Sequence, residues 1–104
     1  MRRTKTLTIE EIKNVIISHK EELRKKYGVA EIGIFGSVLR GENNRKSDLD
    51  ILVELEENNN IGLLTFINME NYLSDLLGMK VDLVEKASLK PRISRHILKE
   101  VQFL

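Results

Sequence analysis

The sequence predicts an α/β (α+β) fold in which a small mixed β-sheet of three or more strands is flanked by helices. The first observation is that segments with apolar residues at helical spacing alternate with short, β-branched apolar segments. Their order along the chain is helix, strand, loop, strand, helix, strand, helix. The second observation is that a helix joins the second and third strands, which suggests a crossover connection between them. The relative direction of the first two strands stays open.

The composition is that of a globular protein, and we expect residues 1–104 to form a single domain. The 17 Lys and Arg residues nearly balance the 16 Asp and Glu residues, so no overall field attracts nucleic acid or a membrane, and no direct nucleic-acid binding is expected. The absence of cysteine excludes disulfides, thiolate catalysis and sulfur-ligated metals. No apolar run could span a membrane, and no apolar stretch follows the basic N-terminus as in a signal peptide. A cytoplasmic location is therefore expected.

The first helix is expected to run from about Ile9 to Tyr27. Thr8 and Glu11 have the spacing of a capping box at its start, and Gly28 is a natural stop at its end. Its apolar residues fall on one stripe: Ile9, Ile12, Ile16, Leu23 and Tyr27. The segment from Val29 to Phe35 is apolar, β-branched and bounded by glycines, which predicts a largely buried first strand.

The middle of the chain predicts a loop, a second strand and a second helix. Residues 36–46 hold glycines, asparagines and basic residues and are expected to form a loop. Apolar residues alternate over 49–55, as in a strand, and the asparagines at 58–60 are expected to cap the following helix. That helix is expected over about 62–77, ending at Gly78. Its apolar stripe consists of Leu63, Phe66, Ile67, Leu73, Leu76 and Leu77.

The last part of the chain predicts a third strand over 80–84 and a third helix. Pro91 is tolerated in the first turn of a helix, so residues 88–91 are interpreted as a helix start. The expected apolar face of this helix consists of Ile93, Ile97, Val101 and Leu104.

Two carboxylates stand at the beginning of the second strand. Asp48 and Asp50 are two residues apart, so the alternation of a strand places both on one face. Adjacent carboxylates repel each other unless they are exposed or bridged by a divalent cation, and hard oxygen ligands favour Mg²⁺. The alternative is that Asp48 and Asp50, with Glu54 and Glu56, form the solvated face of an edge strand.

A third carboxylate, Asp82, lies in the otherwise apolar third strand. A carboxylate there needs either a partner or an exposed position. If the third strand neighbours the first two, Asp82 lies close to Asp48 and Asp50, but an ordinary exposed strand position would explain it equally well.

A glycine turn follows the first strand. Gly36 allows the backbone to approach a ligand closely, and N–H groups exposed at such a turn bind phosphate oxygens. Ser37 adds a hydroxyl donor and Arg40 a fixed positive charge. Taken alone, a Gly-Ser pair is more often only a turn, and Arg45 and Lys46 are better explained as part of a solvated basic loop.

Together these residues resemble the nucleotidyltransferase superfamily typified by DNA polymerase β. The shared arrangement is Gly36-Ser37, ten residues, Asp48-Leu49-Asp50 on a strand, and Asp82 on a later strand. The flanking residues match the small prokaryotic branch, the minimal nucleotidyltransferase (MNT) domain: Phe35, Arg40, Gly41 and Ser47. The resemblance extends from the first helix to the last and implies the nucleotidyltransferase fold.

The resemblance also implies the site and its chemistry. Two Mg²⁺ ions would be held by residues that are also catalytic: Asp48, Asp50 and Asp82. The nucleotide would be bound by Gly36, Ser37, Arg40 and Ser47. A hydroxyl would attack the α-phosphate of a nucleoside triphosphate in line and release pyrophosphate, with Asp82 placed to help deprotonate that hydroxyl.

The family further implies a partner. Larger members carry an additional domain, so the acceptor surface is expected to come from another chain, a second copy or a free substrate. In the MNT family the frequent partner is a HEPN-domain toxin, so ATP and a tyrosine of such a toxin are the expected substrates and an antitoxin role the expected function. The alternatives are nucleotidylation of a small-molecule hydroxyl and a non-catalytic toxin-binding module.

Overall fold

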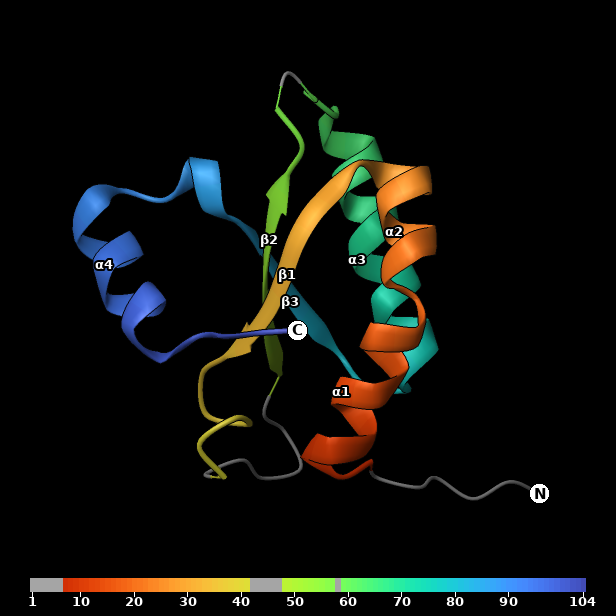
Figure 1. Cartoon of the computed structure of the whole chain (residues 1–104), viewed down its shortest axis with the longest axis vertical. Coiled ribbons are helices and arrows are strands. Elements are labelled where there is room, and N and C mark those ends of the chain that lie inside the picture. The colour runs from red at the N-terminus through yellow and green to blue at the C-terminus, as the bar shows by residue number, and fades with distance from the viewer. Residues whose placement is uncertain (1–6, 42–47, 58) are drawn as a thin grey trace.

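The computed structural model describes residues 7–41, 48–57 and 59–104. These residues form a four-stranded mixed sheet in the order β3-β2-β1-β4 (Figure 1). Strand β1 (Val29–Phe35) is antiparallel to both β2 (Leu49–Leu55) and β4 (Gln102–Phe103), whereas β3 (Val81–Glu85) is parallel to β2. The predicted fold class is therefore confirmed, and so are the bounds of the first two strands. The third strand lies one residue later than predicted.

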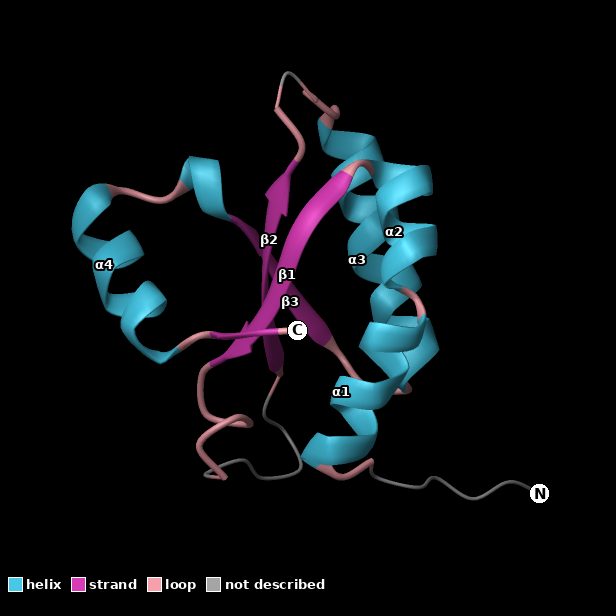
Figure 2. Ribbon diagram, in the orientation of Figure 1, coloured by secondary structure: helices cyan, strands magenta, loops and turns pink. Residues whose placement is uncertain are grey.

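Helices cover both faces of the sheet (Figure 2). Helices α1 (Ile9–Ser18), α2 (Lys20–Tyr27) and α3 (Leu63–Leu77) lie on one face, where they enclose the main core. A short 3₁₀ helix, η1 (Lys86–Ser88), leads from β3 to α4 (Pro91–Glu100) on the other face. No helix among the described residues is long and apolar enough to cross a membrane.

The predicted first helix is in fact two helices that meet at His19. Its start is as expected, since the Thr8 hydroxyl accepts from the Glu11 N–H at 3.1 Å and the Glu11 carboxylate accepts from the Thr8 N–H at 2.8 Å. The break follows from local side-chain bonds to the carbonyl of Val15, which lies 2.9 Å from Ser18 Oγ and 2.8 Å from His19 Nδ1. Such side-chain bonds compete with the backbone hydrogen bonds of a helix. Here they accompany the end of α1 at Ser18, although the stripe of apolar residues continues beyond this point.

The asparagine cap predicted for α3 is wrong, because the N-cap residue is Gly62. Asn59 instead donates its side-chain amide to the carbonyls of Tyr27 and Gly28, at 3.0 and 3.3 Å, and ties this segment to the end of α2. The predicted stripe of α3 is also partly wrong: Leu63 is 73% exposed. The buried residues of this helix are Met69, Leu73 and Leu77.

The prediction that the last helix includes Val101 and Leu104 is wrong. Helix α4 ends at Glu100, and the chain then pairs with Gly33 and Ile34 of β1 as strand β4. Glycine is required at position 33, because a Cβ there would lie 2.7 Å from the Val101 side chain and 2.9 Å from a β4 carbonyl. Residues 102 and 103 therefore form backbone hydrogen bonds along the open edge of β1 and do not continue the helix.

A second, smaller core lies under α4. It consists of Phe35 from β1, Leu52 from β2 and Ile97 from α4, with Val84 and Val101 packed against it. Leu52 is fully buried there. The face of β2 that carries Asp50 at the start of the strand therefore supports α4 further along, which explains why Leu52 on this face is apolar.

Candidate active site

The sheet brings two of the predicted carboxylates together. Strands β2 and β3 are parallel, and Asp50 is directly paired with Asp82 in their register, so both side chains leave the same face of neighbouring strands. Asp48 precedes β2 directly. Asp48 and Asp50 are half-buried and Asp82 is exposed. Because β2 is an internal strand, the alternative of a solvated edge-strand face is wrong.

This arrangement shifts the pKa of Asp50. Burial, followed by the charges of Asp82, Asp48 and Glu100, raises the pKa of Asp50 to about 6, and the Arg40 guanidinium acts in the opposite direction. The cluster thus carries more negative charge than its neighbouring cation compensates. Perturbed carboxyl groups of this kind are typical of functional sites.

The cluster has the donor chemistry of a divalent-cation site. Carboxylate oxygens are the ligands that Mg²⁺ prefers, and a bound cation would relieve the repulsion around Asp50. Within the described part of the chain, no group of three acidic or histidine side chains is arranged to hold a metal ion by itself. Mg²⁺ commonly keeps waters and takes ligands from a substrate phosphate, so an open set of carboxylates fits it.

The Gly36 turn lies directly against Asp50. Gly36 has φ +89°, and a Cβ at this position would lie 2.0 Å from Oδ2 of Asp50. The carbonyl of Gly36 accepts from the Arg40 N–H at 3.2 Å, so residues 36–40 close into one tight turn. Ser37 is half-buried within it. The turn thus places the Gly36 backbone against Asp50, and the Arg40 guanidinium is near enough to act on the pKa of that carboxyl group.

One acidic residue at this site was missed by the sequence interpretation. Glu100, the last residue of α4, accepts from the Gly36 N–H at 3.1 Å and from Arg40 Nη1 at 2.6 Å. A signal was present, since Glu100 is the lone acid of an otherwise basic helix and stands at its negative end, where a carboxylate needs a partner.

The structure thus brings together Asp50, Asp82, Gly36, Ser37 and Arg40, with Asp48 at the head of β2. Ser47, the fourth residue predicted to bind nucleotide, lies outside the described residues, as do Arg45 and Lys46.

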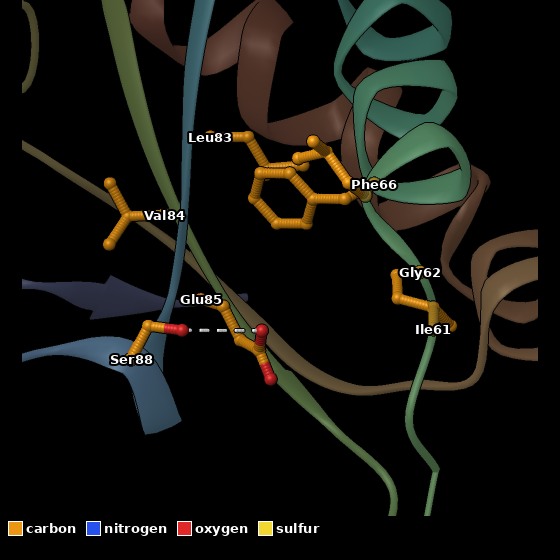
Figure 3. Close-up of a pocket in the computed structure, with 8 residues that line it drawn as sticks. Ile61, Gly62, Phe66, Leu83, Val84, Glu85 and Ser88 are labelled. Atoms are coloured by element: carbon orange, nitrogen blue, oxygen red, sulfur yellow. Dashed lines mark hydrogen bonds between the residues drawn. The ribbon is translucent and has the colours of Figure 1, made fainter.

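Away from the carboxylate cluster, a hollow of about 400 Å³ opens between the start of α3 and the C-terminal end of β3 (Figure 3). Apolar side chains line most of it, including Phe66 and Leu83, with Glu85 and Ser88 at its rim. None of the predicted site residues lines this hollow. The carboxylate cluster, which combines perturbed acids with anion-binding donors, is therefore the stronger candidate.

The pKa of Asp50 predicts how stability depends on pH. A carboxyl group whose folded pKa lies above its unfolded value stabilises the fold at low pH, and this contribution is lost as pH rises from about 4 through about 6. We expect Asp50→Asn and wild type to melt at similar temperatures at pH 4, and the variant to melt higher at pH 7. Thermal melts of both proteins across this range measure the difference. A difference that does not change with pH would contradict the assignment.

Residues 16–104 match a protein family that is described as the nucleotidyltransferase domain. Among curated relatives, the protein adenylyltransferase MntA of Thermococcus cleftensis is 52% identical over 98 residues, which cover 94% of this chain and 97% of that protein. A relative from Methanocaldococcus jannaschii is 48% identical over 98 residues, covering 93% of this chain and 98% of its own.

Solved structures share the fold. One described provisionally as a minimal nucleotidyltransferase has a TM-score of 0.71 and 34% identity, covering 89% of this chain and 95% of that one. A toxin–antitoxin crystal structure with AMP-PNP has a TM-score of 0.71 and 25% identity, covering 86% of this chain and 69% of that one. A tri-AMPylated HEPN toxin in complex with its MNT antitoxin, from Shewanella oneidensis, contains a chain with a TM-score of 0.64 and 18% identity; the match covers 88% of this chain and 70% of that one. At this identity it supports the fold alone.

Proposed function

Because the chain belongs to the nucleotidyltransferase domain family, and within it to the minimal nucleotidyltransferases, we propose that it transfers AMP from ATP to a protein hydroxyl. The acceptor is a tyrosine of a HEPN-type toxin, and the chain acts as the antitoxin. The support for the acceptor class is that a 52% identical relative is a protein adenylyltransferase and that a structural relative at 25% identity belongs to a toxin–antitoxin structure with AMP-PNP.

The observation that carries the proposal is the pairing of Asp50 with Asp82 beside the Gly36 turn. The pairing puts carboxylates and anion-binding donors within one small region. In-line transfer of a nucleotidyl group needs both, since charge builds up on the attacking oxygen and on the leaving phosphate.

The phosphates of ATP are bound by the turn. The Gly36 N–H, the Ser37 hydroxyl and the Arg40 guanidinium are hydrogen-bond donors, and Arg40 also supplies a charge that remains at every physiological pH. Ser47 is proposed to join them. Together these groups orient the triphosphate so that its α-phosphorus faces the carboxylates, and such orientation is the main contribution of a protein to phosphoryl-group transfer.

The carboxylates of Asp48, Asp50 and Asp82 would hold Mg²⁺, with two ions as in the family. Bound Mg²⁺ would supply positive charge to the attacking and leaving oxygens. The charge cluster around Asp50, described above, supports this assignment, because a group with a raised pKa gains from a bound cation.

We assign to Asp82 the role of accepting the proton of the attacking hydroxyl. It is the exposed member of the cluster and stands on the edge strand β3, where an incoming side chain can approach it. As the tyrosine oxygen bonds to the α-phosphorus, the bond between that phosphorus and the bridging oxygen breaks and pyrophosphate leaves. The tyrosine proton passes to Asp82, and the products are an AMP–tyrosine ester and pyrophosphate.

The proposal is tested by transfer of label from α-labelled ATP. The protein is incubated with Mg²⁺ and either a purified HEPN-domain protein or lysate of the source organism, and the Asp48→Asn/Asp50→Asn variant and an EDTA sample serve as controls. We expect label on one protein band with wild type and Mg²⁺ only, and mass spectrometry should locate AMP on a tyrosine.

Two other outcomes would redirect the proposal. A new labelled small molecule, distinct from ATP, ADP and AMP, together with unlabelled protein, would support a small-molecule hydroxyl as acceptor. Absence of any labelled product other than ATP and its hydrolysis products, together with a stable complex between the protein and the toxin, would support the non-catalytic binding module.

A further inference from the structure

Glu100 accepts hydrogen bonds from two of the donors that the proposed function assigns to phosphate, Gly36 and Arg40. One carboxylate oxygen accepts from the Gly36 N–H at 3.1 Å and the other accepts from Arg40 at 2.6 Å. A carboxylate that bridges a turn N–H and a guanidinium has the charge and the hydrogen bonds of a bound phosphate oxygen pair. The ion pair is partly sheltered, since 26% of the Glu100 side chain and 45% of the Arg40 side chain is exposed.

The position of Glu100 is fixed by the packing of the chain before it and after it. One turn earlier on α4, Ile97 is buried against Phe35 and Leu52. After Glu100, the chain runs directly into β4, which pairs with β1 (Figure 1). The end of α4 therefore lies beside the end of β1, where the Gly36 turn begins. The contact is set by two packed elements and is not an incidental approach of a long surface side chain.

The position is also one where a carboxylate is otherwise disfavoured. Glu100 stands at the C-terminal end of a helix, which carries partial negative charge, and its charge adds to the rise in the pKa of Asp50. The Gly36 and Arg40 donors offset this cost. When a triphosphate binds to these donors, Glu100 loses its hydrogen bonds to them. Its carboxylate is then left next to the negative charge of the triphosphate.

We propose that Glu100 is an internal competitor for the phosphate-binding donors, and that it weakens the affinity of the site for the triphosphate. A triphosphate has to displace the carboxylate before it can bind Gly36 and Arg40, and the carboxylate can return when pyrophosphate leaves. Glu100 thus acts on nucleotide affinity through two donors and not on the bonds that react. The inference rests on the proposed function in taking these donors as the phosphate site.

The experiment measures binding of inorganic triphosphate, without metal, by titration calorimetry. Glu100→Asp keeps the charge but shortens the side chain, so it cannot hold both donors; Glu100→Gln keeps the length but not the charge. Glu54→Asp is the matched control, because Glu54 lies on the same strand as Asp50 and is paired with Lys86 at 3.5 Å, away from the turn. Thermal melts confirm that each variant is folded.

We expect Glu100→Asp and Glu100→Gln to bind triphosphate about tenfold more tightly than wild type, the order of one charge-assisted hydrogen bond that no longer has to be broken. Glu54→Asp should bind as wild type does. In the transfer assay both Glu100 variants should show a lower KM for ATP without a higher kcat. Tighter binding by Glu100→Asp separates displacement from simple loss of charge. Unchanged or weaker binding in both variants would overturn the inference and make Glu100 a residue that positions Arg40.

The inference and the proposed function fail separately. If wild type transfers AMP but neither Glu100 variant gains affinity for triphosphate, the competitor role is wrong and the function stands. If the Glu100 variants gain affinity but no AMP is transferred to any acceptor, the competitor role stands for an anion site whose reaction is different.

Discussion

Asp50→Asn should lower AMP transfer by about a thousandfold, which corresponds to about 4 kcal/mol of lost transition-state stabilisation. Asp50 is at the centre of the cluster: it is paired in register with Asp82, lies against the Gly36 turn and has a pKa raised to about 6. Asparagine keeps the shape of the side chain but removes the charge that would hold a cation. The loss should appear mainly in kcat.

The same substitution should not destabilise the protein. At neutral pH the folded state ionises Asp50 against burial and against neighbouring negative charge, and asparagine removes that repulsion. We expect a melting temperature at neutral pH that is higher than that of wild type, by up to about 5 °C. Kinetics and thermal melts on the same preparations provide the measurement. A variant that retains more than a tenth of the wild-type rate would show that Asp50 does not carry the chemistry.

Gly36→Ala should have the second largest effect, on both activity and stability. A Cβ at position 36 would lie 2.0 Å from Oδ2 of Asp50 and 2.9 Å from its Cγ, so the carboxylate or the turn must move. The residue also has φ +89°, a conformation that costs an alanine about 1 kcal/mol or more. Since the displaced groups are those proposed to bind phosphate and cation, transfer should fall at least about a hundredfold.

Gly78→Ala provides the control for backbone strain. Gly78 ends α3 with φ +67°, and a Cβ there would meet nothing within 4 Å. This variant should lose a similar amount of stability from the left-handed backbone alone, about 1 kcal/mol, and keep wild-type transfer rates. Chemical denaturation and the transfer assay compare the two variants. Equal rates in Gly36→Ala and Gly78→Ala would contradict a role for the Gly36 turn.

The sequence was sufficient to predict the parts of the site that depend on local periodicity. The alternation of apolar residues over Leu49–Leu55 located β2, and the same period of two placed Asp48 and Asp50 on one face. The direct pairing of Asp50 with Asp82 needed more, because it depends on β3 lying next to β2 and parallel to it. The helical connection between these strands suggested this order but did not establish the register.

The sequence was not sufficient where a long-range contact or a competing local bond decides the structure. The break at His19 arises from bonds to the Val15 carbonyl within an otherwise continuous helical stripe. The end of α4 at Glu100 arises from pairing with a strand far away in the chain, which helical periodicity cannot reveal. The contact between Glu100 and Gly36 follows from that pairing, and for this reason the residue was missed.

The pairing of β4 with β1 also has a consequence for the order of folding during synthesis. Strand β1 leaves the ribosome early, but its outer neighbour follows only after β2, α3, β3 and α4. Until then Phe35 and Leu52 lack the Ile97 side chain that covers them. A nascent chain that has already paired β1, β2 and β3 would therefore leave the face that carries Phe35 and Leu52 uncovered until α4 docks. Docking of α4 onto this face, closed by β4, is the step that completes the fold, and a chaperone that shields apolar surface would act before it.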